Sequence, residues 1–364
     1  MTIKEITNLL EELAPLAYAE DFDNVGLLVG NANAQVSGVL VTLDTLENVV
    51  DEAIENNCNL IVSFHPIIFS GLKKLTGANY VERVAIKAIQ NNIAIYSMHT
   101  ALDNNIDGVN AKICEVLNID KPKILIPQKG TIKKLTTYVP TANLDKLKKA
   151  LYKVGAGAIG NYSDCSFTVE GTGSYKAGQG TNPSIGKIGE THLEKETQLH
   201  ITYSKGIEKE LLTALHHHHP YEEVAYEILT LENINQNIGM GMIGELKEPM
   251  NEIDFLNQMK QKMNVSCIRH STLLNKPVQK VAVLGGSGAF AIGAAKASGA
   301  DVFITADVKY HQFYEAEDKM IIADIGHYET EQFTKNLLVD YLTKKIPNFA
   351  VRLSESKTNP IKYL

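Results

Sequence analysis

The first third of the chain alternates short apolar runs with segments whose apolar residues recur at helical spacing. We predict strands at 39–43, 59–63 and 93–98 from the apolar runs. Helices are predicted between and after them, at about 46–56, 80–91 and 108–117. Apolar strands joined by amphipathic helices indicate an α/β fold with a parallel sheet and crossover helices.

The same order of elements returns after residue 278. Strands are predicted at 280–284, 301–305 and 320–324, with helices at 290–298 and 310–317 and at the end of the chain. In each region a strand runs into a histidine, and a carboxylate follows four residues later: His99 with Asp103, and His327 with Glu331. We therefore predict two related α/β lobes that form one body, a single unit used twice.

The middle of the chain has a different pattern. Strand-like runs at 134–138, 166–171 and 198–203 alternate with helices at 144–154 and 208–216, and glycines crowd 171–189. This pattern predicts a βαβ–βαβ ferredoxin-like α+β domain with a long flexible loop. The predicted domains are a first metal-binding lobe at 1–129, an inserted domain at 130–237 and a second metal-binding lobe at 238–364.

Composition excludes several classes of protein. A net charge of −7 gives no basic surface for a nucleic-acid backbone, so no nucleic-acid partner is expected. The four cysteines contain no Cys-x-x-Cys pair, which fits a reducing compartment. Thr2 and Glu5 predict a helix capping box in place of a signal peptide. No apolar run is long enough for a membrane span, so we expect a cytoplasmic protein without membrane association.

Three histidines are predicted at the ends of strands, where open parallel sheets gather their ligands. They are His65, His99 and His327. The spacings His99-x-x-x-Asp103 and His327-x-x-x-Glu331 put each pair on one face of a helix. One such pair alone is more often a capped helix with an incidental histidine, but two in matching places predict a metal site. Imidazole and carboxylate ligands suit one or two ions of Zn²⁺, with Fe²⁺, Mn²⁺ or Co²⁺ as alternatives.

Other segments keep two interpretations each. Gly285–Gly288 follows a strand, so its N–H groups can cradle a phosphate, or the segment is only a tight turn. Asp307 and His311 either extend the metal site or cap and solvate a helix. Thr305 and Tyr310 lie near the same predicted cleft without a decided role.

Two further segments stay open in the same way. Asp23 and Asn24 either contact substrate or only form a turn. The run His216–His219 either binds metals adventitiously or is a polar loop.

Taken together, these motifs resemble the GTP cyclohydrolase 1 type 2 homologue family, also called the NGG-interacting-factor-three-like family. The segments that carry the resemblance are residues 23–27, 65–69, 99–103, 307–311, 326–331 and 358–360. The resemblance implies a dinuclear metal centre inside a toroidal homohexamer. It also implies that the inserted domain, with its residues 219–222, is PII-like or CutA-like.

Carried onto this chain, the family's metal ligands fall on His65, Asp103, His327 and Glu331, with His99 close by. One position departs from the family pattern, because Phe64 stands where the family has the first histidine of a His-His pair. Phenylalanine cannot ligate, so the ion that would have used this ligand is expected to bind more weakly, to have water in its place or to be absent, unless His99 compensates.

Three functions are compatible with the sequence. The first is a metal-dependent hydrolase acting on a nucleotide or related heterocycle, GTP cyclohydrolase-like, with no catalytic residue assigned. The second is a non-catalytic metal-binding or regulatory toroidal assembly in which the insert senses a small-molecule ligand. The third, a dinucleotide oxidoreductase, rests only on Gly285–Gly288 and ranks below the others because the glycine pattern is incomplete.

Overall fold

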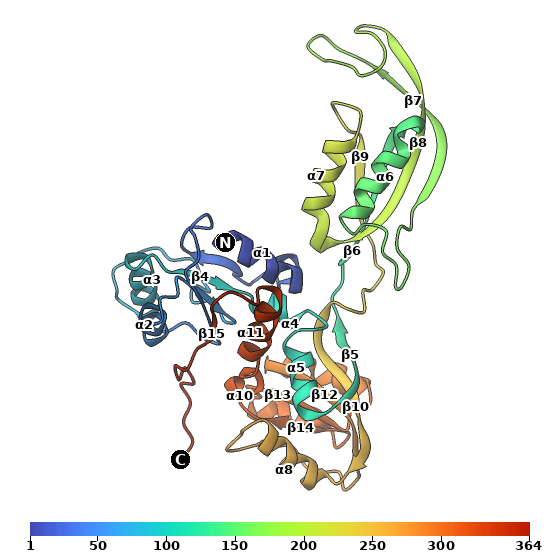
Figure 1. Ribbon diagram of the computed structural model, residues 1–364. Coiled ribbons are helices and arrows are strands. Elements are labelled where there is room, and N and C mark those ends of the chain that lie inside the picture. Colours follow the sequence, from blue (N-terminus) through green and yellow to red (C-terminus); the bar gives the residue numbers. More distant parts are fainter. The chain divides into compact units, whose positions relative to one another are not determined.

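The computed structural model describes residues 1–364, which form two compact units. Unit 1 comprises residues 1–128 and 236–364, and unit 2 comprises residues 129–235 (Figure 1). The chain is a mixed α/β structure with three sheets, two in unit 1 and one in unit 2. None of its helices combines the length and the apolar character needed to cross a membrane.

The first sheet of unit 1 has five strands in the order β1-β4-β3-β2-β15. These are β1 (Gly26–Val29), β2 (Val39–Thr42), β3 (Leu60–Ser63), β4 (Ala94–Ser97) and β15 (Val351–Leu353). The three strands predicted from apolar runs are confirmed, and they pair in parallel. The sheet also contains a strand that was not predicted, β1, which pairs antiparallel with β4 at the edge.

The helices of this region are the predicted amphipathic ones, with two short additions. They are α1 (Ile3–Leu13), η1 (Leu16–Tyr18), α2 (Glu47–Glu55), α3 (Tyr80–Gln90), α4 (His99–Asp103) and α5 (Val109–Leu117). The predicted capping box is confirmed: the Glu5 backbone N–H donates to Thr2 Oγ1 and the Thr2 N–H donates to Glu5 Oε2. These bonds satisfy backbone donors that the first turn leaves without helical partners.

The second sheet of unit 1 has six strands in the order β11-β14-β13-β12-β10-β5. These are β5 (Asp120–Pro127), β10 (Gly239–Met250), β11 (Arg269–His270), β12 (Val278–Ser287), β13 (Val302–Ala306) and β14 (Ile321–Asp324). The helices of this region are α8 (Glu252–Lys262), η4 (Ala289–Ala291), α9 (Ile292–Ala297), η5 (Tyr310–Ala316) and α10 (His327–Glu331). The last helix, α11 (Thr334–Lys345), packs against β2 and β15 of the first sheet. The helix predicted at 310–317 is a 3₁₀ helix. Only β12, β13 and β14 are parallel, so this sheet is also mixed.

Four strands of each sheet follow the same spatial order. The order β1-β4-β3-β2 in the first sheet corresponds to β11-β14-β13-β12 in the second, and in both the first strand is the antiparallel one. A short helix follows β4 and another follows β14, namely α4 and α10. Asp103 and Glu331 are the last residues of these two helices, so the carboxylates take matching places.

Successive residues of a strand point to opposite faces of each sheet and pack into different hydrophobic cores. In β2, Val39 and Val41 enter a large core shared by both sheets, while Leu40 packs under α2 and α3. In β13, Ile304 enters the shared core and Phe303 packs with residues of α9. Both sheets are therefore covered on both faces, which is why their strands read as continuous apolar runs.

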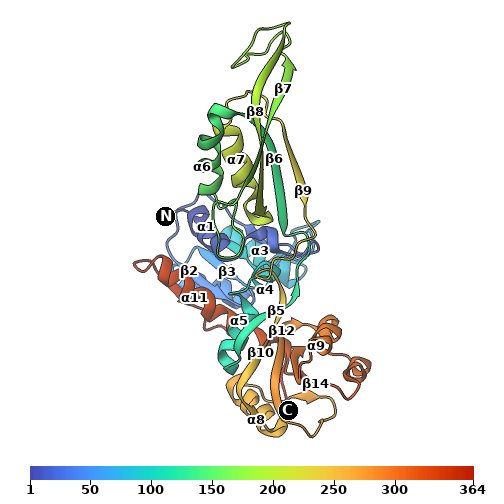
Figure 2. The ribbon, with the colours of Figure 1, turned by 90° about the vertical axis from the view of Figure 1, so that its right-hand side faces the viewer.

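Unit 2 is one four-stranded antiparallel sheet with two helices on one face (Figure 2). Its elements are β6 (Ile132–Pro140), η2 (Thr141–Asn143), α6 (Leu144–Lys153), β7 (Phe167–Lys176), β8 (Thr191–Ser204), η3 (Lys205–Ile207), α7 (Glu208–His218) and β9 (Tyr226–Thr230), in the sheet order β7-β8-β6-β9. The helices bury Leu147 and Leu211 against Leu135 and Leu199 of the sheet. The loop predicted from residue 171 begins later, because Gly171 and Gly173 continue β7 and pair with β8.

Strands β5 and β10 lie on either side of unit 2 in the sequence. They pair antiparallel, with Pro127 opposite Gly239, and the Gln128 N–H donates to the Ile238 carbonyl over 2.8 Å. The two ends of unit 1 that flank residues 129–235 are therefore joined by backbone hydrogen bonds.

Candidate metal centre

His65 follows the end of β3 and is fixed by both its backbone and its ring. The His65 N–H donates to the Leu43 carbonyl, and the Ser63 hydroxyl donates to the His65 carbonyl. The ring Nδ1 lies 2.8 Å from Asp44 Oδ1. Because the carboxylate accepts the Nδ1 proton, the Nε2 atom is directed away from Asp44.

His327 begins α10 just after β14 and is held in the same way. Its Nδ1 lies 2.7 Å from Asp307 Oδ2. Asp307 has a left-handed backbone conformation (φ 56°), which a short polar side chain tolerates. The residue before His327 is Gly326, which has φ 98°. A Cβ at this position would lie 2.2 Å from Glu329 Oε2.

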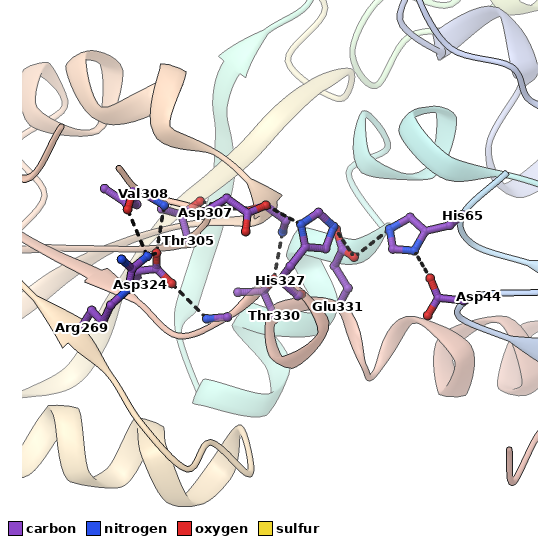
Figure 3. A network of polar contacts seen from close by, with 12 residues as sticks. Asp44, His65, Arg269, Thr305, Asp307, Val308, Asp324, His327, Thr330 and Glu331 are labelled. Atoms are coloured by element: carbon purple, nitrogen blue, oxygen red, sulfur yellow. Dashed lines mark hydrogen bonds and ion pairs between the residues drawn. The ribbon is translucent and has the colours of Figure 1, made fainter. Parts of the chain in front are cut away.

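The two histidines face one buried carboxylate. Glu331 Oε2 lies 3.0 Å from His65 Nε2 and 3.3 Å from His327 Nε2 (Figure 3). The Glu331 side chain is only 4% exposed, and Oε2 has no partner with regular hydrogen-bond geometry. Three ligand atoms thus lie within 4.8 Å of one another, the arrangement expected around a cation.

His99 lies beside this group, and its ring is oriented by a third carboxylate. The His99 ring centroid is 5.4 Å from that of His65, and Nδ1 is 2.8 Å from Asp23 Oδ1. The Thr100 N–H and hydroxyl donate to the other oxygen of Asp23. Burial opposes ionisation of Asp23, but the bonds from His99 and Thr100 outweigh it and lower its pKa. Asp23 therefore positions His99, whose Nε2 carries no proton when Nδ1 donates.

Asp103 completes the predicted set, although it is not one of the three converging ligands. Its Oδ1 is buried and has no hydrogen-bond partner. Burial and then the neighbouring Glu331 charge raise the pKa of Asp103 well above its ordinary value. A buried oxygen without a donor is destabilising unless a cation or a proton satisfies it. The side chain therefore suits a metal ligand.

The electrostatics of the site favour positive charge. Burial disfavours the imidazolium of His65, but Asp44 and Glu331 outweigh burial and raise its pKa to about 10. The pKa of His327 rises in the same way to about 9. Burial would raise the pKa of Glu331, yet His327 and His65 lower it to about 2. A divalent ion would satisfy the same excess of negative charge.

The glycines before η4 make room for Glu331. A Cβ on Gly286 would lie 2.3 Å from Glu331 Oε1, and Gly286 has φ 66°. The Gly285 N–H donates to Asn110 Oδ1 and the Gly286 N–H donates to Thr330 Oγ1. Two of the backbone donors of the possible phosphate cradle are therefore used inside the protein, and both glycines belong to β12.

The remaining candidates divide between this site and other roles. Asp307 is at the site through His327, whereas the ring contacts of His311 are with Tyr310 and Tyr314 on η5. Thr305 donates its hydroxyl to the Gly286 carbonyl. Asn24 donates to the Ile68 carbonyl, which fits the turn interpretation.

The histidine run is not the polar loop that the sequence suggested. His216 to His218 form the last turn of α7, and His219 is its C-cap. His219 is buried, accepts the Tyr221 N–H at Nδ1 and donates from Nε2 to the Tyr138 carbonyl. It is therefore a structural residue of unit 2.

Sequence reasoning missed Asp44. This residue follows β2 and contacts His65 across two neighbouring parallel strands. The one available signal was its place after a buried strand, at the same sheet edge as His65.

Comparisons with known proteins give a consistent family. The family model described as Duf34/NIF3 (NGG1p interacting factor 3) matches residues 1–360. The chain is 38% identical over 367 positions to the GTP cyclohydrolase 1 type 2 homolog of Bacillus subtilis strain 168, covering 99% of this chain and 98% of the relative.

Two solved structures extend this comparison. The Bacillus cereus protein related to NIF3 superposes with a TM-score of 0.84 at 35% identity, over 100% of this chain and 99% of that one. Staphylococcus aureus protein SA1388 gives a TM-score of 0.76 at 30% identity with the same coverage.

Proposed function

The chain belongs to the Duf34/NIF3 family, and we propose that it is a divalent-metal protein whose first ion is held by His65, His327 and Glu331. The observation that carries the proposal is the orientation of the two imidazoles. Asp44 and Asp307 occupy both Nδ1 atoms, so both Nε2 atoms meet the buried Glu331 carboxylate. Carboxylate–histidine pairs of this kind orient ligands at metal sites.

A second ion has a less complete set of ligands. Asp103 offers an oxygen without a hydrogen-bond donor, and His99 offers an oriented imidazole. Phe64 is fully buried where the family pattern places a histidine. We therefore propose one tight site and a second, weaker one, with Zn²⁺ as the ion that the nitrogen and oxygen ligands suit best and Fe²⁺, Mn²⁺ or Co²⁺ as alternatives.

The proposed activity is hydrolysis of a nucleotide or a related heterocycle. A divalent ion in the site would supply Lewis acidity. Glu331 or a nearby carboxylate would handle the proton. Phe22 and Phe69 are exposed, their ring centroids lie 6.4 Å apart, and Phe69 is 6.2 Å from the His99 ring. These exposed aromatic rings suit stacking against a flat ring of a substrate.

The alternative is a non-catalytic metal-binding or regulatory assembly. Phe64 favours it, since loss of a ligand suits binding more than turnover. The internal use of the Gly285 and Gly286 N–H groups also removes one support for a nucleotide. In both versions we propose a toroidal homohexamer located in the cytoplasm, which light scattering and fractionation would test.

We also infer that unit 2 is a ferredoxin-like domain of the PII-like or CutA-like kind inserted into a body of two related lobes. Its βαββαβ element order and its antiparallel sheet order β7-β8-β6-β9 support this inference.

Elemental analysis of untagged protein and its His327→Ala variant tests the metal proposal. We expect at most two ions per chain in the native protein and fewer in the variant. His311→Ala is the matched control, because this histidine is exposed and its ring contacts Tyr310 and Tyr314 within η5. Loss of metal only when residues 216–218 are replaced would instead assign it to the end of α7. Assays on a nucleotide panel then separate hydrolase from binding protein.

A further inference from the structure

Unit 2 contains a cavity of about 590 Å³ on the sheet face that the helices leave uncovered. Tyr138, Gln198 and Val169 lie opposite one another on β6, β8 and β7, so they share one face. Leu199 and Leu135 point the other way, into the core beneath α6 and α7. Residues 177–184 and 221–225 complete the walls. The volume is that of a small-molecule site.

The floor of the cavity is shaped by glycine. Gly171 and Gly173 pair with Glu196 and Glu194 on β8. A Cβ on Gly173 would lie 2.0 Å from Glu196 Oε2. The absence of a side chain therefore lets the Glu196 carboxylate lie across β7 within the cavity.

Aromatic rings and carboxylates line this space together. The Tyr221 hydroxyl donates to Glu196 Oε1 over 2.7 Å, and the Tyr221 ring lies 5.8 Å from that of Tyr175. Tyr175 donates to the Ile185 carbonyl, which ties the 177–190 segment down. Asn182 donates its N–H to Glu222 and ties the same segment to the opposite wall.

The charged residues around the cavity favour a cationic ligand. The charged residues that line the cavity are Glu170, Glu196, Glu222, Glu223 and, as the single base, Lys176. On β7 the side chains of Glu170 and Lys176 alternate with that of Val169 and point to the opposite face, so the carboxylates of the cavity face are those of Glu196, Glu222 and Glu223. An excess of carboxylates repels phosphates and other anions. Tyrosine faces attract organic cations through their quadrupole, and adjacent carboxylates strengthen the attraction.

We propose that this cavity binds a small organic ammonium compound, with its cationic head between Tyr175, Tyr221 and Glu196. Such binding would give unit 2 a ligand of its own, distinct in chemistry from any substrate of the metal centre.

Isothermal titration calorimetry on the full-length protein tests this proposal with three ligands: spermidine, tetramethylammonium and ATP. We expect one of the two cations to bind and ATP not to bind in the cavity. Glu196→Gln keeps the side-chain shape and removes the charge, so cation affinity should fall about tenfold or more. Gly173→Ala should weaken binding as well, because the new Cβ displaces the carboxylate.

Glu227→Gln is the control, since Glu227 pairs with Thr136 on the same sheet but lies outside the cavity. Chelation of metal should leave cation binding unchanged, which separates this proposal from that for the metal centre. Absence of binding by either cation, equal affinity in Glu196→Gln, or ATP binding abolished by Gly173→Ala would each overturn the proposal.

Discussion

His65 and His327 follow strands of different sheets of unit 1, yet their Nε2 atoms approach the same oxygen of Glu331, at 3.0 and 3.3 Å. Their ring centroids lie 5.4 Å apart. Each ring is turned by its own aspartate. The site is therefore defined by four carboxylate–imidazole contacts, and each can be tested separately.

Replacing Asp44 or Asp307 by asparagine should weaken metal binding without removing a ligand. The amide no longer fixes the imidazole tautomer as strongly, so we expect a loss of roughly 10–100-fold in affinity. Competition with a chromophoric chelator measures this loss. Asp107→Asn, an exposed change away from the site, should bind like the native protein. Equal affinity in all three variants would remove the orienting role of the aspartates.

Gly286→Ala should disturb the position of Glu331. The left-handed backbone and the close approach to Oε1 together should lower the free energy of unfolding by about 1–3 kcal/mol and reduce bound metal. Gly293→Ala is the matched change, because its Cβ would meet nothing within 4 Å in α9. It should raise stability by roughly 0.5–1 kcal/mol. Thermal unfolding and elemental analysis of both variants provide the comparison.

Phe64→His should increase the metal content, because it restores a possible ligand beside His65. The ring centroids of residues 64 and 65 are 4.9 Å apart. The change places a polar ring in a fully buried position, so we expect a loss of about 1–3 kcal/mol in stability. Phe64→Leu controls for the altered packing and should gain no metal. A histidine variant with native metal content would contradict a second site near residue 64.

Glu82 should make the segment before α3 sensitive to acid. Its carboxylate accepts bonds from the Thr76 N–H and hydroxyl and from the Ala78 N–H, and the Thr76 bonds lead in lowering its pKa to about 2. A lowered pKa contributes stability that is complete above about pH 4.5 and is lost as the pH falls toward 2. Thermal unfolding of Glu82→Gln should differ from native protein near pH 6 and converge with it near pH 2. Glu55→Gln, exposed on α2, should show no such convergence.

The elements best predicted from the sequence were those with a strong period. Strands β2, β3 and β4 and helices α2 and α3 follow from apolar runs and helical spacing, and the His327–Glu331 pair follows from one turn of helix. By contrast, β15 has only three residues and β10 begins with alternating glycines, so neither strand shows a clear hydrophobic pattern in the sequence. Their pairing depends on strands distant in the sequence.

The sequence predicts which residues are candidate metal ligands, but not the residues that orient them. Spacing identifies which side chains share a face, but not which aspartate turns each ring. Asp44 is 21 positions from His65, and Asp23 is 76 positions from His99. The partners of the Gly285 and Gly286 N–H groups were not predictable for the same reason, since Asn110 and Thr330 reach them from other elements.

The pairing of β5 with β10 makes unit 2, in topological terms, the loop of a β-hairpin. Because the Gln128 N–H already donates to the Ile238 carbonyl, a two-residue turn such as Asn-Gly can replace the residues between Gln128 and Ile238 without stretching the backbone. Evolution can therefore enlarge, exchange or delete this loop while leaving the residues around Glu331 in place.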